Sequence, residues 1–344
     1  MPAASAGRVV GIDYLRAAFS VAVVGVHLGY VFPSAIFDEQ HYAEHTFGWS
    51  DFLNFYVLCL AVPAFVLIST FLYARKPADA AGLGRRLWRI ARLLVFWSVA
   101  LQIFRYGGFE AVKHVPRDSK ELALYLLRGG NTYYYFFVDL IFVTVVTHGA
   151  TRLSSPAVWG LFAASTLMVG VLPMLHRETH NLFLALNANP FNFVPFAFAG
   201  VGLARLSAAG DDRALGRVGL GCLTLAAASA ILDWTAYVDP VFFQVNEYAL
   251  PAYTRPSLVF LAVAVVVLAL RFRWPENAVM RFMAVHSLAV YCLHPFFVDA
   301  KQKMVQVLHL NPAGAALVPW AVVLALSYAG SVVLPAFLRP ELVR

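Results

Sequence analysis

The chain has 344 residues, of which 60% are hydrophobic and only 13% are charged. A soluble domain carries about 25% charged residues, so this composition excludes a soluble globular protein and indicates an all-α membrane protein with many spans. The net charge of +7 does not indicate nucleic-acid binding, because the basic residues follow the loops of a membrane protein rather than forming one patch.

The first apolar stretch, residues 9–32, is long enough to cross a bilayer but contains Asp13, Arg16 and His27. Ionisable groups inside a span cost about 2.5–3.5 kcal/mol each and therefore tend to face the protein interior. The spacing of Arg16 and His27 in the sequence places both residues on one helix face, roughly 16 Å apart along the axis. Asp13 precedes Arg16 by one helical turn, so we expect the two to pair. The span thus predicts a cation near one membrane surface and an imidazole near mid-depth.

Nine further apolar stretches follow, and we predict a polytopic transmembrane helical bundle of about ten spans. The predicted spans are Val9–Phe32, Phe52–Tyr73, Leu87–Phe104, Tyr133–Thr147, Pro156–Leu175, Phe191–Leu206, Val218–Trp234, Ser257–Leu270, Val279–Val298 and Ala315–Leu338. We expect them to form a single transmembrane domain over residues 1–344, with no appended soluble domain.

The basic residues predict the orientation of these spans. Of the 26 Lys and Arg residues, seventeen fall on the side of the two termini, counting those just inside span ends. The other nine are Arg105, Lys113, Arg117, Lys120, Arg128, Arg177, Arg255, Lys301 and Lys303. Because short cytoplasmic loops carry an excess of Lys and Arg, both termini are predicted to be cytoplasmic.

The most basic stretch joins the second and third spans. Arg85, Arg89 and Arg92 recur at i, i+4 and i+7, on one face of the predicted helix, with Arg86 beside them. A planar guanidinium matches the geometry of phosphate oxygens, so this stripe predicts a phosphate-binding site at the cytoplasmic end of the span. A simple signal of membrane topology is the alternative for the same residues.

Two later spans also carry polar residues. Ser287, Tyr291 and His294 lie at i, i+4 and i+7 in the ninth span, so they share one helix face. Asp139 lies inside the fourth span. Substrate binding has a structural alternative in each case: packing at the membrane interface for Tyr291 and His294, and an intramembrane hydrogen bond or ion pair for Asp139. In the outer loops, aromatic rings and amides such as those of residues 131–135 suit a sugar ligand, and anchoring at the membrane interface is the alternative for the same residues.

These patterns resemble a known family of membrane enzymes. The matching elements are Asp13-x-x-Arg16 followed by His27, Arg89-Ile-Ala-Arg92 at the third span, and Ser287-x-x-x-Tyr291-x-x-His294-Pro295 in the ninth. They are similar to those of the acyltransferase 3 family, whose members O-acylate polysaccharides, lipid-linked sugars, osmoregulated glucans and macrolides. The second span is also similar, although Thr70 stands where many members have Gly, and Asp139 has no counterpart in the family pattern.

The resemblance implies a multi-pass enzyme of the cell membrane, which in bacteria is the inner membrane. Such an enzyme moves an acyl group, by default acetyl, from cytoplasmic acyl-CoA to a hydroxyl group on the outer side. The acceptor would be a carbohydrate, a glycolipid or a similar molecule. The candidate residues are His27, Arg16 and Asp13 for catalysis, Arg85, Arg86, Arg89 and Arg92 for CoA, and Tyr291, His294 and Asp139 for the acceptor. His27 would act as a general base or form an acyl-imidazole. We expect membrane lipid but no nucleic acid as a partner, and no metal, because the spacing of His41 and His45 is only a weak metal signal.

Other classes of protein fit part of the pattern. A transporter or flippase for a glycolipid or small solute also has many spans with charges inside them. It gives no reason, however, for arginines placed above an intramembrane histidine, and no inverted repeat is visible in the sequence. A structural or sensory membrane subunit would not need the complete Arg16, His27, Arg89 and Arg92 set. Other membrane O-acyltransferases with a different histidine-centred core are disfavoured by a histidine in the first span.

Overall fold

The computed structural model describes residues 8–29, 31–38, 40–76, 79–108, 110–239, 242–243 and 248–336. Within these ranges all regular structure is helical, which confirms the prediction of an all-α membrane bundle. Tyr30 in the first predicted span, the end of the last one at 337–338, and Arg339 and Arg344, which were counted for orientation, lie outside the described residues.

Seven helical segments of the described chain are long and apolar enough to cross a membrane. They are Val10–His27 (α1), Trp49–Ala74 (α2, η3 and α3), Ala80–Tyr106 (α4), Ser155–Thr179 (α8), Leu182–Ala209 (α9, η4 and α10), Asp212–Ala236 (α11) and Gly314–Ala336 (in α17 and η5). An eighth results if α14, Ala278–Leu293, is one span with Pro295–Val307, from which it is bent by 56°. Two shorter apolar helices are α7, Tyr135–Ala150, and α13, Pro256–Arg271. Each of the ten predicted spans therefore coincides with a helical segment.

The remaining helices are short, or are parts of these segments. Their bounds are Ala35–Phe37 (η1), Tyr42–Glu44 (η2), Trp49–Phe52 (α2), Leu53–Leu58 (η3, a π-helix), Ala61–Ala74 (α3), Glu110–Lys113 (α5), Ser119–Leu127 (α6), Leu182–Ala185 (α9), Pro190–Phe193 (η4), Val194–Ala209 (α10), Pro295–Val298 (α15), Lys301–Val307 (α16), Pro312–Val333 (α17) and Leu334–Ala336 (η5).

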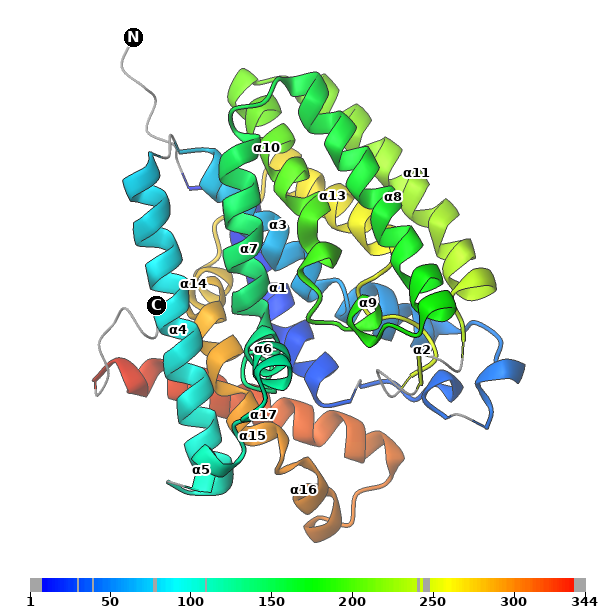
Figure 1. Cartoon of the computed structure of the whole chain (residues 1–344), viewed down its shortest axis with the longest axis vertical. Coiled ribbons are helices and arrows are strands. Elements are labelled where there is room, and N and C mark those ends of the chain that lie inside the picture. The colour runs from blue at the N-terminus through cyan, green and yellow to red at the C-terminus, as the bar shows by residue number, and fades with distance from the viewer. Residues whose placement is uncertain are drawn as a thin grey trace.

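The helices pack around α1 and α3. Helix α1 contacts α3, α13, α14 and α17, and α3 also contacts α7, α10 and α13. Helix α4 lies on one flank of the bundle and packs against α7, whereas α8 and α11 lie on the opposite flank (Figure 1). The side chains of α3 are almost all buried, whereas α4 and α11 expose many apolar residues, as expected for helices that face lipid.

Helix α1 is shorter than the predicted span because a glycine ends it. The chain leaves the helix at Leu28 and continues through Gly29 at φ +79°, a conformation that glycine adopts without strain. His27 is therefore the last residue of α1, rather than an interior residue of a longer helix as we expected. The helix runs roughly 16 Å from Arg16 to this end.

Close packing of α3 against α10 depends on one small residue. Thr70 on α3 donates a hydrogen bond to the Phe196 carbonyl on α10 at 2.8 Å. A Cβ atom at Gly200 would lie 2.3 Å from the Thr70 hydroxyl oxygen. The glycine on α10 thus makes room for the threonine on α3, which is how this chain accommodates Thr70 at a position where glycine is common in the family it resembles.

Candidate active site

A basic cavity opens between the start of α1, the end of α3 and the start of α4. We call it the arginine cavity; its volume is about 700 Å³. Its ionisable lining residues are Arg8, Arg16, Arg75, Lys76, Arg85, Arg86 and Arg89, with the carboxylates of Asp13 and Asp79. Positive groups thus far outnumber negative ones in one concave surface. Such a surface attracts and holds an anion with several charges.

A second, smaller pocket of about 320 Å³ adjoins the arginine cavity, and we call it the inner pocket. The two share the lining residues Arg16, Leu72, Arg86 and Arg89. Away from these, the inner pocket is lined mostly by apolar side chains of α3, α4, α7 and α14, and it reaches Tyr291. A charged mouth is therefore continuous with an apolar passage into the bundle.

Arg86 is held in place at the junction of the two cavities. Its guanidinium donates to the Ser69 hydroxyl at 2.6 Å and lies over the Tyr73 ring at 4.9 Å. The Tyr73 hydroxyl is in turn 3.0 Å from the Nδ1 atom of His148. These contacts fix the position of the Arg86 side chain before any ligand binds, which lowers the entropy cost of binding.

Arg16 and Asp13 do not pair as we expected. Asp13 forms its ion pair with Arg8, at 2.5 Å, because Arg8 lies just before the helix and reaches forward along its first turn. Arg16 instead donates to the Ser287 hydroxyl on α14 at 3.2 Å and lines both cavities. Asp13 still lies in the lining of the arginine cavity, where it offsets part of the positive charge.

The four arginines in the first half of α4 divide into two groups. Arg85, Arg86 and Arg89 line the arginine cavity. Arg92 lines neither cavity; its side chain is exposed and its guanidinium lies 5.9 Å from the Trp88 ring. The residues of this turn that line the inner pocket are Ile90 and Leu93 instead. The helix rotates Arg92 away from the passage, so the predicted one-sided stripe is incomplete.

Two histidines meet at the far end of α1. The Nδ1 atom of His27 lies 2.6 Å from the Nε2 atom of His294, and the two rings are nearly parallel. The Tyr133 ring packs on His27 with centroids 4.4 Å apart. His294 is fully buried, whereas His27 is only partly buried. Of the pair, His27 is therefore the less buried residue.

Ser287 and His294 point toward α1, as their spacing predicts, whereas the Tyr291 ring packs against Phe136 and Phe137 of α7. Ser287 bonds to Arg16 and His294 bonds to His27, while Tyr291 lies between them along α14. The Tyr291 ring ends the inner pocket and lies 5.8 Å from the His294 ring, and its hydroxyl donates to the Tyr133 carbonyl. The passage from the arginines therefore stops at Tyr291, with His294 between that ring and His27.

Asp139 does not take part in this arrangement. It is 0% exposed, and neither carboxylate oxygen has a hydrogen-bond partner among the described residues. It does not line the arginine cavity or the inner pocket, whose α7 residues are Phe136, Phe137 and Leu140 on another face of the helix. The structure thus gives Asp139 neither the expected intramembrane partner nor a place in the passage.

A charged group beside the histidine pair was missed by the sequence analysis. Arg105 near the end of α4 forms a two-point ion pair with Asp299, at 2.9 and 3.2 Å, and its guanidinium lies over the Tyr133 ring at 5.9 Å. Lys301 donates to the Leu28 carbonyl at 2.5 Å. The signal available in the sequence was the position of Asp299 and Lys301 directly after the His294-Pro295 element. Arg105 thus lies against the ring that packs on His27, and Lys301 binds the carbonyl of the residue that follows His27.

The described residues contain no group of three or more His, Cys, Asp or Glu side chains arranged to hold a metal ion. His45 instead pairs with Asp51 at 2.7 Å, and His41 donates to Asp38 at 2.6 Å. The Asp38 hydrogen bond raises the pKa of the exposed His41 above its ordinary value, which favours the protonated ring and opposes metal binding.

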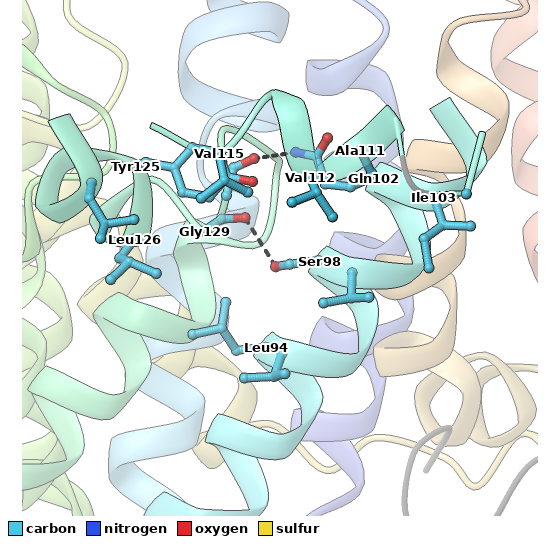
Figure 2. Close-up of a pocket in the computed structure, with 15 residues that line it drawn as sticks. Leu94, Ser98, Gln102, Ile103, Ala111, Val112, Val115, Tyr125, Leu126 and Gly129 are labelled. Atoms are coloured by element: carbon cyan, nitrogen blue, oxygen red, sulfur yellow. Dashed lines mark hydrogen bonds between the residues drawn. The ribbon is translucent and has the colours of Figure 1, made fainter. Parts of the chain in front are cut away.

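A third cavity of about 600 Å³ lies between the second half of α4 and the segment from Gly108 to Gly130 (Figure 2). Its lining is apolar apart from Ser98, Gln102 and Tyr125, and the first two of these form hydrogen bonds with backbone carbonyls. The Ser98 hydroxyl donates to the Gly129 carbonyl at 3.0 Å, and the Gln102 amide donates to the Gly130 carbonyl at 2.5 Å. No lining residue is a histidine, carboxylate, lysine or arginine, so this cavity offers no group for acid–base chemistry or phosphate binding.

The comparison with protein families agrees with this geometry. The acyltransferase 3 family model, described as an acyltransferase domain, matches residues 9–336. The chain belongs to the acyltransferase 3 family. The match covers nearly the whole chain, so all helices that build the two cavities and the histidine pair lie inside this acyltransferase 3 domain. No curated protein and no solved structure matched the chain.

Proposed function

We propose that this acyltransferase is an O-acetyltransferase of the bacterial inner membrane. It takes acetyl from acetyl-CoA in the cytoplasm and transfers it to a hydroxyl of a carbohydrate-type acceptor at the outer side. The observation that carries the proposal is the arginine cavity together with the mostly apolar inner pocket that adjoins it and reaches Tyr291, whose ring lies 5.8 Å from the His294 ring. Both termini are cytoplasmic in this proposal, since the arginine cavity lies at the start of α1 and basic loops favour that side.

The two cavities suit the two parts of acyl-CoA. Its nucleotide end carries phosphate groups, which the guanidinium groups of the arginine cavity would bind in pairs of hydrogen bonds. Its pantetheine arm is long, thin and mostly uncharged, which suits the smaller, mostly apolar inner pocket. The thioester at the end of that arm would then approach Tyr291, and this ring must turn before the thioester can meet His27.

His27 is proposed as the group that activates the acceptor. A neutral imidazole accepts the hydroxyl proton while the acceptor oxygen attacks the thioester carbonyl. The carbon–sulfur bond then breaks, and the proton passes from His27 to the leaving thiolate, so no net proton is gained or lost. A covalent acyl-imidazole on His27 is the alternative route to the same products.

The acceptor is proposed to bind beside Tyr133, whose ring packs on His27; both residues are only partly buried. Aromatic faces and charged hydrogen-bonding groups such as Tyr133 and Arg105 are suited to a hydroxylated ring. The buried position of His294 does not support direct contact with the acceptor, and the acceptor roles of Tyr291 and Asp139 stay predictions.

The test is transfer of a labelled acetyl group by purified protein in phospholipid vesicles that contain an envelope glycan extract. Acetyl-CoA labelled in the acetyl group should yield a labelled glycan, and the His27→Ala variant should lose nearly all of this product. His286→Ala, which removes another histidine of the same bundle, is the matched control for folding and expression. Unchanged transfer by His27→Ala would exclude its catalytic role. Uptake of a solute without acetyl transfer would identify a transporter instead.

A further inference from the structure

The hydrogen bonds of His294 determine which of its nitrogens carries the proton. Its Nδ1 atom lies 3.1 Å from the Val290 carbonyl oxygen, one turn earlier in α14. A carbonyl oxygen only accepts hydrogen bonds, so Nδ1 must be the protonated nitrogen. In the neutral ring the lone pair is then on Nε2, the atom that faces His27.

The same reasoning fixes the protonation of His27. The His294 Nε2 lone pair accepts a hydrogen bond, and the atom 2.6 Å away is the Nδ1 atom of His27. His27 must therefore be protonated at Nδ1, which leaves its own Nε2 atom with the lone pair. A base or a nucleophile needs this lone pair, so the requirement is the same whether His27 removes a proton or forms an acyl-imidazole.

The fold holds His294 in the orientation that this chain of hydrogen bonds needs. His294 is 0% exposed and is followed by Pro295, which has no backbone N–H to continue the helix. At this point the chain bends by 56° between α14 and the segment Pro295–Val307. The backbone N–H of His294 bonds to the same Val290 carbonyl at 3.0 Å, so one carbonyl anchors both the main chain and the ring.

We infer that His294 is a positioning residue, which holds His27 in the tautomer whose Nε2 atom is unprotonated and faces the substrate. The inference rests on the proposed function of His27. When the acceptor hydroxyl gives its proton to His27 Nε2, the ring becomes an imidazolium whose Nδ1–H remains bonded to His294. That bond strengthens as the charge forms and lowers the barrier, and the proton then moves to the CoA thiolate as the carbon–sulfur bond breaks. In serine proteases a buried aspartate similarly sets the tautomer of the catalytic histidine.

The inference is tested with two substitutions at His294 and one double variant, each measured as acetyl transfer and as CoA affinity. His294→Phe keeps a buried ring but removes the acceptor atom, so kcat should fall about 100- to 1000-fold, in the lower part of the range for general-base catalysis, while CoA affinity stays within twofold. His294→Gln places an amide oxygen near the former Nε2 position and should recover at least tenfold of this loss. Recovery by glutamine would show that an acceptor atom, rather than ring volume, is what His27 requires.

The double variant separates a positioning role from a structural one. If His294 acts only through His27, the His27→Ala/His294→Phe double variant should be no slower than His27→Ala alone, because the base is already absent. Losses that multiply in the double variant, or a kcat within threefold of wild type for His294→Phe, would overturn the inference. Failure of the proposed function gives a different result, namely no acetyl transfer by the wild-type protein or full transfer by His27→Ala.

Discussion

Replacement of Arg86 by glutamine should weaken binding of CoA more than replacement of a surface arginine. Arg86 lines both the arginine cavity and the inner pocket, and its contacts with Ser69 and Tyr73 fix its guanidinium before the ligand arrives. A hydrogen bond to a charged group contributes about 1.5–3 kcal/mol. At 1.4 kcal/mol for each factor of ten, the loss corresponds to a dissociation constant that rises about 10- to 150-fold. Because the wild-type side chain is already ordered, little of this loss should be offset by regained side-chain entropy.

The measurement is calorimetric titration of CoA into purified protein, with Arg213→Gln as the control. Arg213 is an exposed residue near the start of α11 and lines neither cavity, so it reports the effect of the charge change alone. The loss caused by Arg86→Gln should shrink in high salt, since an ionic contact with phosphate is screened. An affinity within twofold of wild type, or an equal loss in the Arg213 variant, would refute the assignment of the arginine cavity to the phosphates of CoA.

Three further predictions concern other contacts. Arg89→Ala should reduce CoA affinity at least fivefold more than Arg92→Ala in the same titration, because Arg89 lines the cavities and Arg92 does not. Equal losses of affinity would contradict a difference between the two arginines. Arg255→Met should destabilise the protein by about 3–5 kcal/mol in thermal unfolding, because it removes the cation that pairs with the buried Asp233 carboxylate at 3.2 Å. The added change Asp233→Asn should recover part of this loss, because it removes the unpaired charge. No recovery would show that lost packing is the cause. Gly200→Ala should cost about 1–3 kcal/mol, because the new methyl group overlaps the facing threonine of α3; an unchanged melting temperature would contradict this close packing.

The sequence predicted the fold well because membrane spans are read from local composition. Each predicted span corresponds to a helical segment, since about 20 apolar residues in a row identify a span without knowledge of its neighbours. Boundaries were less accurate where a backbone conformation decides them. Gly29 ends α1 several residues before its apolar stretch ends, and the π-helix from Leu53 to Leu58 gave no signal in the pattern.

The sequence predicted the arrangement of the candidate site residues only where that arrangement depends on the geometry of a single helix. The common face of Arg16 and His27 and that of Ser287, Tyr291 and His294 follow from helical periodicity, and both faces were found to meet. Contacts between helices were not predictable in this way. The contribution of Arg8, Arg75 and Lys76 to the arginine cavity depends on how α1, α3 and α4 converge, which a single sequence does not show.

The errors have the same physical origin. The local pairing rule assigned Asp13 to Arg16, but Arg16 turns to Ser287 on α14 and leaves Asp13 to Arg8. The direct bond between His27 and His294 joins residues at opposite ends of the chain, so no local pattern indicates it. Intramembrane charges were correctly expected to face the protein interior, but which partner they meet there is decided by packing.

The packing of α1 against α14 gives a physical reason for the spacing between Arg16 and His27. Both residues reach α14, the first through Ser287 and the second through His294. Adding or removing one residue between Arg16 and His27 would turn one of them about 100° away from α14 and break one of these bonds. In the proposed mechanism, the spacing therefore serves two functions on one interface: the guanidinium stays at the mouth of the passage, while the imidazole stays against the ring that is inferred to set its tautomer. A helix with the same two residues at another spacing would keep the charges but lose the connection between donor site and base.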